Sequence, residues 1–531
     1  TAGQPIRTER RMQSATHPRT HGWSRRQFIF GSAAALGVAS LGISGRMLAQ
    51  PRFDAYPFAL GVASGEPDSN GFVLWTRIAP TQTDAAFLPM HDFVVDWVVA
   101  EDEALSRVVR RGSAIASAEW AHSVHVELEG LAANRPYWYQ FRCGGEASAI
   151  GRTRTLPLAG APVARLRLAL ASCQHYEHGY FAAYRHMLAD DLDLVVHVGD
   201  YIYEGSFGAQ VRRHDSPNGA QTLADYRSRH ACYKGDADLQ RAHAAYPWLL
   251  TWDDHEVSND YAGVASNDGE SREAFTARRT AAYRAYYEHM PLRARHRPSG
   301  MAMPMYGRTR FGDLAEISVL DDRQYRAAHA CAERGEYVDD CKQRWSRTQT
   351  MLGDTQRNWL ESGLAGSTSR WNVIAQQTLI APFVARADDG HEQVWTDGWD
   401  GYAGARAQLL DFIGDRSIAN VVTLGGDVHA FYANDLKADF EDPSSAVVAT
   451  EFVGTSLATQ GDDYATIARD LPRNPHVRYF ENRWRGYLRC EITPQLWRSD
   501  LRIVDDATDV DSAARTLVSL HVESGRAGVQ A

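Results

Sequence analysis

Acidic, thiol, phenol and imidazole side chains follow four separate apolar stretches of this 531-residue chain. In chain order, these side chains are Cys173, then Asp200 with Tyr203, then Asp254 with His255 and Asn259, and finally Asp427 with His429. Carboxylate oxygens favour hard cations, whereas thiolate and imidazole favour transition metals. The mixture therefore suits two dissimilar metal ions better than one. A tyrosinate ligand indicates ferric iron, because a phenol needs a strongly polarising ion to lose its proton near neutral pH.

Each group also has an ordinary structural interpretation. A single cysteine at a strand end, such as Cys173, is usually part of the core, and Gly199-Asp200 is typical of a turn. The run Asp-Asp-His-Glu at 253–256 could cap a helix, and Gly-Gly-Asp-Val-His at 425–429 could form another turn. We favour the metal interpretation because all four groups offer the ligand types that a two-metal site needs.

Such a site requires a fold that brings distant strand ends together. The apolar stretches 166–172, 193–199, 248–252 and 420–424 are typical of buried strands, and helical spacing follows the first of them at 180–188. Strands separated by helices predict an α/β layered domain, in which ligands gather where strands end. Short strand-like stretches between 54 and 156 predict a small all-β sandwich before that domain.

We therefore divide the chain into four parts: 1–50 is a signal peptide with an N-terminal extension, 54–157 is the β-sandwich, 163–510 is the α/β domain, and 511–531 is a C-terminal tail. Within the first part, Ser24-Arg25-Arg26 begins a segment that resembles a twin-arginine export signal, and an uncharged stretch follows at 28–45. We expect recognition by the twin-arginine machinery, delivery to the periplasm or the outside, and no stable membrane span. The alternative is an uncleaved N-terminal anchor.

The overall charge argues against nucleic acid as a partner. The formal net charge is −10, and residues 1–50 carry seven arginines but only one acid, Glu9, so the remaining chain is more acidic still. An acidic chain offers polyanions no general attraction, although a metal-rich cleft can still take a phosphate ester. Cys331 and Cys341 lie close together in a polar segment, where a disulfide is possible in an exported protein and two free thiols are the alternative.

Five motifs resemble the successive signatures of the PhoD-type alkaline phosphatases, the alkaline phosphatase D family of the calcineurin-like and purple acid phosphatase superfamily. They are SCQ at 172–174, GDYIYE at 199–204, TWDDHE at 251–256, LDDRQY at 320–325 and GGDVH at 425–429. Further similar stretches are ASGEP at 63–67, TDGWDGY at 396–402 and EFVGTS at 451–456. The resemblance covers about residues 58–500 and implies an α/β/β/α four-layer catalytic core behind a fibronectin-like β-sandwich.

The resemblance also implies a ligand set. Cys173, Asp200, Tyr203 and His429 would hold Fe³⁺, and Asp200 would bridge to a second site where Asp254, Asn259 and Asp427 would bind Ca²⁺. The superfamily usually has Asn in place of Asp254 and His in place of Asp427, and carboxylate oxygens at both positions agree with the harder calcium ion. Gln376 or Gln377 stands near the position of a superfamily metal histidine. Other divalent ions could replace either metal.

By the same resemblance we expect an alkaline phosphatase that hydrolyses phosphate mono- or diesters by attack of metal-activated hydroxide. His255 would orient the phosphate or protonate the leaving oxygen. Arg323 would bind the phosphate in bidentate fashion, and its alternative role is a surface ion pair with Asp321 or Asp322.

Two other functions remain open from sequence. One is a phosphodiesterase or phospholipase D-like activity on the same scaffold, and the other is a non-catalytic secreted binding protein. We expect a monomer.

Overall fold

The computed structural model describes residues 51–80 and 90–530. The predicted twin-arginine segment lies outside these ranges. Within them, no helix combines the length and the apolar character that a membrane span would need.

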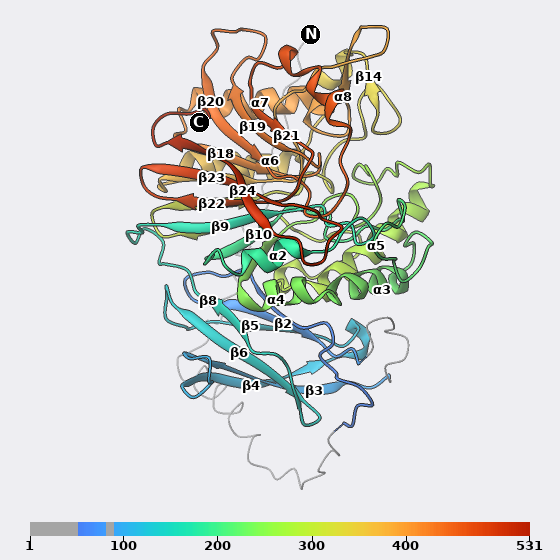
Figure 1. Ribbon diagram of the computed structural model, residues 1–531, viewed down its shortest axis with the longest axis vertical. Coiled ribbons are helices and arrows are strands. Elements are labelled where there is room, and N and C mark those ends of the chain that lie inside the picture. The colour runs from blue at the N-terminus through green and yellow to red at the C-terminus, as the bar shows by residue number, and fades with distance from the viewer. Residues whose placement is uncertain (1–50, 81–89, 531) are drawn as a thin grey trace, which may run out of the picture. The chain divides into compact units, whose positions relative to one another are not determined.

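Two large sheets dominate the described chain (Figure 1). The nine-stranded sheet has the order β24 (Ala514–Glu523), β23 (Leu496–Val504), β22 (Arg485–Ile492), β9 (Leu166–Ala171), β10 (Leu194–His197), β11 (Pro247–Leu250), β1 (Val62–Gly65), β2 (Phe72–Arg77) and β5 (Ser123–Leu128). The seven-stranded sheet has the order β12 (Gly307–Phe311), β13 (Ala315–Val319), β15 (Trp371–Ala375), β18 (Val421–Gly425), β20 (Val447–Val453), β19 (Phe431–Lys437) and β21 (Val477–Glu481).

The side-chain pattern of each strand explains why the two sheets stack. In β9, Leu166, Leu168 and Leu170 pack in a core that also contains strand residues of the second sheet. The alternate residues Ala169 and Ala171 pack in a different core with helices. Because successive side chains of a strand point to opposite faces, the leucines fill the space between the sheets while the small alanines admit close-packed helices.

Helices cover the outer face of each sheet. The first sheet is covered by α2 (Ala182–Met187), α3 (Leu223–Lys234), α4 (Ala237–Ala245) and α5 (Arg272–His289), and the second by α6 (Gly353–Gly366) and α7 (Ala403–Asp415). The result is the predicted α/β/β/α order of layers. Strands β9, β10 and β11 run parallel to one another, as do β13, β15, β18 and β20, so their carboxyl ends lie at common edges of the sheets.

The predicted N-terminal β-sandwich is present, but one of its layers belongs to the nine-stranded sheet. Its outer layer consists of β3 (Phe93–Ala100), β4 (Val108–Ala116), β6 (Pro136–Cys143), β7 (Glu146–Ala147) and β8 (Gly151–Arg154). Its inner layer is β1, β2 and β5, and buried side chains from both layers form one core. β1 pairs in parallel with β11, where Ser64 lies opposite Pro247 and Gly65 opposite Trp248.

The α/β region also contains strands that local sequence patterns do not reveal. Residues 511–531, predicted as a tail, include β24, which pairs along its length with β23 at the edge of the sheet. A third small sheet joins β14 (Tyr337–Val338), β17 (Glu392–Trp395) and β16 (Ala385–Arg386). A disulfide between Cys331 and Cys341 closes the loop that carries β14. The boundaries 54–157 and 163–510 stay a prediction.

Candidate metal centre

Side chains from four strand ends meet at one place in the structure. The potential ligand atoms of Cys173, Asp200 and His429 all lie within 4.8 Å of one another. The Tyr203 hydroxyl donates a hydrogen bond to the Asp200 carboxylate at 2.8 Å and lies 3.2 Å from Nε2 of His429. Cys173 follows β9, Asp200 and Tyr203 follow β10, and His429 follows β18. The Cys173 thiol and the Tyr203 phenol are therefore neighbours of the His429 imidazole, which lies more than two hundred positions further along the chain.

Carboxylates form a second group that shares a member with the first. Asp200, Asp253, Asp254 and Asp427 place oxygen atoms within 4.8 Å of one another, so Asp200 belongs to both groups. Asp253 was not among the predicted ligands, although it stands in the same Asp-Asp-His-Glu run as Asp254. The predicted Asn259 lines the adjoining cavity, and its backbone N–H donates to Glu204 at 2.9 Å.

Left-handed backbone is common to four of these residues. The φ angles of the four are 56° at Cys173, 54° at Asp200, 65° at Asp427 and 51° at His429. Non-glycine residues adopt positive φ in only a few per cent of cases, roughly, and such strain gathers at functional sites. The turn interpretation of these motifs is thus correct for the backbone, while the turns also aim the ligand side chains.

Glycines beside the ligands leave room for this convergence. A Cβ atom on Gly199, whose φ is 112°, would lie 2.3 Å from Cβ of Asp253, and one on Gly426 would lie 2.5 Å from the Ser172 hydroxyl. Larger residues at either position would push apart two strand ends that both carry ligands. The glycines of the GDYIYE and GGDVH motifs are therefore needed for close approach of backbones.

Two glutamate side chains fix the loops that carry the candidate ligands. The Glu256 carboxylate accepts the backbone N–H groups of Asp200 at 3.0 Å, Tyr201 at 2.6 Å and Asp253 at 2.7 Å. One side chain thus joins the loops after β10 and β11. Glu204 lies 2.7 Å from Nδ1 of His255 through its carboxylate oxygen. Sequence reasoning missed both roles, because each depends on which loops lie opposite one another.

Burial sets the electrostatics of the donor set. Removal from water raises the pKa of Cys173, Tyr203 and Asp200 well above their ordinary values, and neighbouring acidic groups add to each rise. Oδ2 of Asp253 and Oδ1 of Asp254 are buried without a hydrogen-bond partner. Crowded carboxylates with unpaired buried oxygens, next to a thiol and a phenol, are stabilised by bound cations. The residues present therefore fit metal ions.

His255 is buried next to the carboxylates and lines the cavity. Burial by itself would lower its pKa, but the carboxylates of Glu204, Asp254 and Asp200 raise the pKa well above the ordinary value. Glu204 fixes the ring through Nδ1, so Nε2 is the nitrogen left for a ligand.

Arg323 does not lie where a phosphate contact was expected. Its side chain is fully buried and does not line the cavity. Nε donates to Asp253, Nη1 donates to Asp397 at 2.5 Å, and Nη2 lies 3.4 Å from Asp427. Its surface ion-pair alternative is also wrong, because Asp321 accepts the backbone N–H of Arg323 rather than its guanidinium. The sequence could not show that four carboxylates would surround this side chain in the core.

The two glutamines near the predicted position of a metal histidine have other partners. Nε2 of Gln377 donates to the backbone oxygens of Trp252 and Leu320, and its Oε1 accepts the backbone N–H of Asp322. Oε1 of Gln376 accepts from the Trp399 indole at 3.1 Å. Gln377 joins the segments that follow β11 and β13, Gln376 holds Trp399, and neither glutamine lines the cavity.

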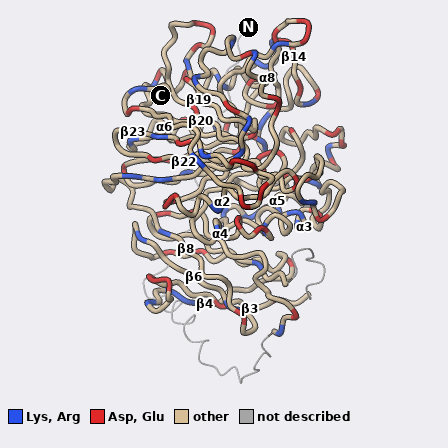
Figure 2. Tube along the Cα trace, viewed as in Figure 1, with Lys and Arg blue, Asp and Glu red and all other residues tan. Residues whose placement is uncertain are grey.

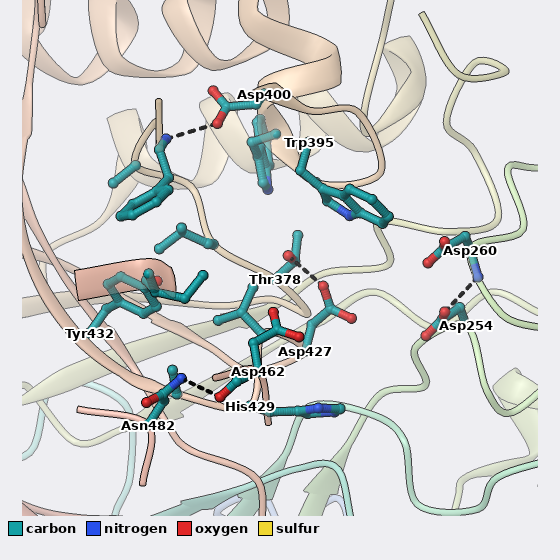
Figure 3. Close-up of a pocket in the computed structure, with 18 of the residues that line it drawn as sticks. Asp254, Asp260, Thr378, Trp395, Asp400, Asp427, His429, Tyr432, Asp462 and Asn482 are labelled. Atoms are coloured by element: carbon teal, nitrogen blue, oxygen red, sulfur yellow. Dashed lines mark hydrogen bonds between the residues drawn. The ribbon is translucent and has the colours of Figure 1, made fainter. Parts of the chain in front are cut away.

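A cavity of about 490 Å³ opens over the ligand set. Asp200, Asp254, His255, Asp427 and His429 line one end of it. Figure 3 shows Asp427 held by Thr378, whose hydroxyl donates to the carboxylate at 2.8 Å, and Asp254 held by the backbone of Asp260. The metal centre is therefore reachable by a small ester.

A further group of potential ligands lies beside the centre. His175, Glu177 and His214 are buried within 4.8 Å of one another. The backbone N–H of Glu177 donates to Nδ1 of His175, and the Glu177 carboxylate accepts from the His214 backbone and the Ser206 hydroxyl. These contacts fasten the loop after β10 to the loop after β9, and we assign no ion to them.

Comparisons with known proteins give a consistent result across the chain. The family model described as PhoD-like phosphatase matches residues 168–501, and the model of the PhoD-like phosphatase N-terminal domain matches residues 44–157. Alkaline phosphatase D of Bacillus subtilis (strain 168) is 44% identical over 526 residues, which are 96% of this chain and 89% of that protein. A solved structure of PhoD superposes with a TM-score of 0.87 at 44% identity, covering 90% of this chain and 93% of the other.

Proposed function

Because the chain belongs to the PhoD-like phosphatase family, we propose that it hydrolyses phosphate esters at the metal centre between its two sheets. The observation that carries this proposal is the convergence of Cys173, Asp200 and His429 within 4.8 Å of one another, with Asp200 and His429 lining an open cavity. A thiol, a carboxylate and an imidazole in contact are an unusual combination for a packed core, but they are ordinary ligands of a transition metal.

We assign the two cations by the chemistry of the donors. Cys173, Tyr203 and His429 would hold Fe³⁺ together with Asp200, and Asp254, Asn259 and Asp427 would hold Ca²⁺, with Asp200 shared. Asp253 is an additional candidate for the calcium side, since its Oδ2 is buried without a hydrogen-bond partner. The support is the separation of soft and hard donors into two groups that share one carboxylate.

The chain's own residues then have distinct tasks in hydrolysis. Bound cations would supply positive charge that neutralises the ester oxygens and lowers the pKa of an attacking water. Arg323 and Thr378 hold the Asp427 carboxylate, and Glu204 holds His255. His255 donates a proton from Nε2 to the leaving oxygen. The Thr378 hydroxyl is engaged by Asp427, so we propose direct attack by water without a covalent intermediate.

Diester hydrolysis, including a phospholipase D-like reaction, is the second candidate. The cavity continues past the ligands to an aromatic end, which leaves space for a second ester substituent. Rates on mono- and diesters of the same aryl alcohol, and on phosphatidylcholine, would separate the alternatives. A non-catalytic binding protein would show none of these activities.

The test of the site is substitution of its soft ligands. Cys173→Ala and His429→Ala should each abolish hydrolysis of an aryl phosphate and should remove iron, measured by elemental analysis and by loss of a tyrosinate-to-iron absorption band. Cys232→Ala is the matched control, because Cys232 is a free cysteine on α3 outside the site. Full activity and full metal content in either ligand variant would refute the assignment.

We further propose that residues 1–50 direct export by the twin-arginine pathway and that the protein acts as a monomer in the periplasm or outside the cell. The support is the Arg25-Arg26 motif followed by an uncharged stretch. The Cys331–Cys341 disulfide suits an oxidising compartment.

A further inference from the structure

The cavity over the metal centre has a second end of different chemistry. Away from the ligands, its wall is formed by aromatic and aliphatic side chains. These are Tyr337, Leu379, Phe383, Trp395, Tyr432 and Phe480. Figure 3 shows Trp395 above and Tyr432 to the left of the Asp427 and His429 side chains.

Contacts between rings make this wall a built surface. The rings of Tyr432 and Phe480, on β19 and β21, lie 4.9 Å apart, and Phe383 lies 6.1 Å from Tyr432. Across the cavity, Tyr337 and Trp395 are paired residues of β14 and β17, and their rings meet edge to face at 5.1 Å. We call these five residues the aromatic wall.

Two members of the aromatic wall are exposed although they are large and apolar. The exposed fraction is 44% for Tyr337 and 38% for Trp395. Rings held side by side by backbone pairing lose little further freedom when they bind a ligand, so they are suited to an apolar group.

Away from the histidines of the metal centre, the charged side chains that line the cavity are all carboxylates. Among the described residues that line it, none is lysine or arginine, whereas Asp260, Asp400 and Asp462 add to the carboxylates of the metal centre. Asp400 is paired with Arg406 at 2.6 Å, and its other oxygen accepts the backbone N–H of Phe383. Figure 2 shows acidic and basic residues interspersed along the whole described trace, so the lack of lysine and arginine is a property of the cavity lining. A second phosphate or a carboxylate on a substrate would meet carboxylates and aromatic faces, both of which disfavour an anion.

We propose that the aromatic wall binds the alcohol part of the ester and selects apolar alcohols that carry no negative charge. The inference rests on the proposed function, because the metal centre places the phosphate and thereby directs the alcohol toward the wall. Esters of aromatic or long aliphatic alcohols are the expected substrates. Nucleoside polyphosphates, bisphosphorylated sugars and inorganic polyphosphate are expected to be poor ones.

A matched series of esters tests the selectivity. For the metal-loaded full-length protein, kcat/KM for 2-naphthyl phosphate should exceed kcat/KM for methyl phosphate after correction for leaving-group reactivity. It should also exceed kcat/KM for a carboxylated naphthyl phosphate by about tenfold or more. Tyr432→Ala and Trp395→Ala should each lower the preference for the naphthyl ester about fivefold to tenfold, the loss expected for one aromatic contact of about 1–1.4 kcal/mol. Tyr56→Ala is the control, because Tyr56 is 45% exposed in the N-terminal sandwich and should leave the ratio unchanged.

Binding of a non-hydrolysable analogue separates this inference from the proposed function. In calorimetry, 2-naphthylphosphonate should bind about tenfold more tightly than methylphosphonate, and Tyr432→Ala should remove the difference. Equal binding of the two phosphonates, or equal rates on neutral and carboxylated esters, would overturn the inference while hydrolysis itself stands. Tight naphthylphosphonate binding without hydrolysis of any ester would instead overturn the proposed function.

Discussion

Arg323 illustrates how a single residue can change role between sequence and structure. In the LDDRQY motif it looks like a surface cation ready for phosphate, but its guanidinium is buried among Asp253, Asp254, Asp397 and Asp427. Asp253, Asp254 and Asp427 also belong to the candidate metal centre, so the Arg323 guanidinium places positive charge beside these carboxylates. Its contacts are those of a side chain that positions ligands, and it is not among the residues that line the cavity.

Substitution of Arg323 by methionine should therefore act on stability and metal content. Removing one partner of a buried ion pair typically costs about 3–5 kcal/mol, because the remaining carboxylates lose their counter-charge. We expect a lower midpoint of thermal unfolding for Arg323→Met and less bound metal after purification. A stable, fully loaded variant whose only defect is a raised KM would show that the side chain binds phosphate after all.

At the scale of elements, the strand ends position the site more than the strands do. Strand pairing brings β9, β10 and β11 together and the stacking of the sheets adds β18, but the left-handed residues after β9, β10 and β18 decide where their ligands point. The glycines inside these turns are as necessary as the ligands, because the turns touch one another through backbone.

Gly199→Ala should disrupt the site without replacing any ligand residue. Its new Cβ would lie 2.3 Å from Asp253 and would also strain a backbone at φ 112°. We expect loss of aryl phosphatase activity and of bound metal. Gly208→Ala is a matched control, since Gly208 has a similar φ of 104° but nothing within 4 Å of the new Cβ. If both variants behave alike, the backbone strain and not the close approach is responsible.

The disulfide should influence substrate choice more than hydrolysis. Cys331 and Cys341 close the loop that carries β14, and β14 holds Tyr337 beside Trp395. In the double variant Cys331→Ser/Cys341→Ser, we expect a smaller preference for naphthyl over methyl phosphate at unchanged metal content. An unchanged ratio would mean that β14 is held by its strand pairing alone.

For the whole molecule, the burial of Lys234 makes the free energy of unfolding depend on pH. The side chain is buried on α3, and burial lowers its pKa from 10.5 to about 7. Its ammonium group lies over the Trp75 ring at 4.3 Å, and its charge lowers the pKa of His230, His243 and His289. The folded state therefore binds this proton less tightly than the unfolded state does.

The sign of the effect follows from that difference in proton binding. Between about pH 7 and 10.5 the unfolded chain holds more protons at Lys234, so its contribution to stability rises with pH across this window and is least favourable below pH 7. The full effect is roughly 4–5 kcal/mol. Lys234→Met should unfold at a higher temperature than the natural protein at pH 6–7. The difference between their midpoints of thermal unfolding should become smaller toward pH 10. Lys437→Met is the control, because Lys437 is partly exposed. A difference in unfolding midpoint between Lys234→Met and the natural protein that stays constant with pH would contradict the expectation.

Local sequence patterns predicted much of this fold and of its candidate site. The residues whose roles they missed are those whose roles depend on tertiary packing. Cys173, Asp200, Asp254 and His429 follow apolar stretches, which is a signal that neighbouring residues carry. Glu256 and the buried setting of Arg323 depend on which loops face one another, and that information lies in the packing. The order of strands in the nine-stranded sheet also depends on packing, because nothing near Ser64 in the sequence indicates Pro247 as its partner.

That pairing has a consequence for how the protein is made. A ribosome delivers β1 long before β11, and Ser64 and Gly65 must wait for Pro247 and Trp248 before their edge of the sheet is closed. Contacts so distant along a chain form slowly and leave strand edges open meanwhile. The newborn polypeptide therefore needs shelter from aggregation until nearly half of it has been translated, and β1 cannot close its edge of the sheet ahead of β11.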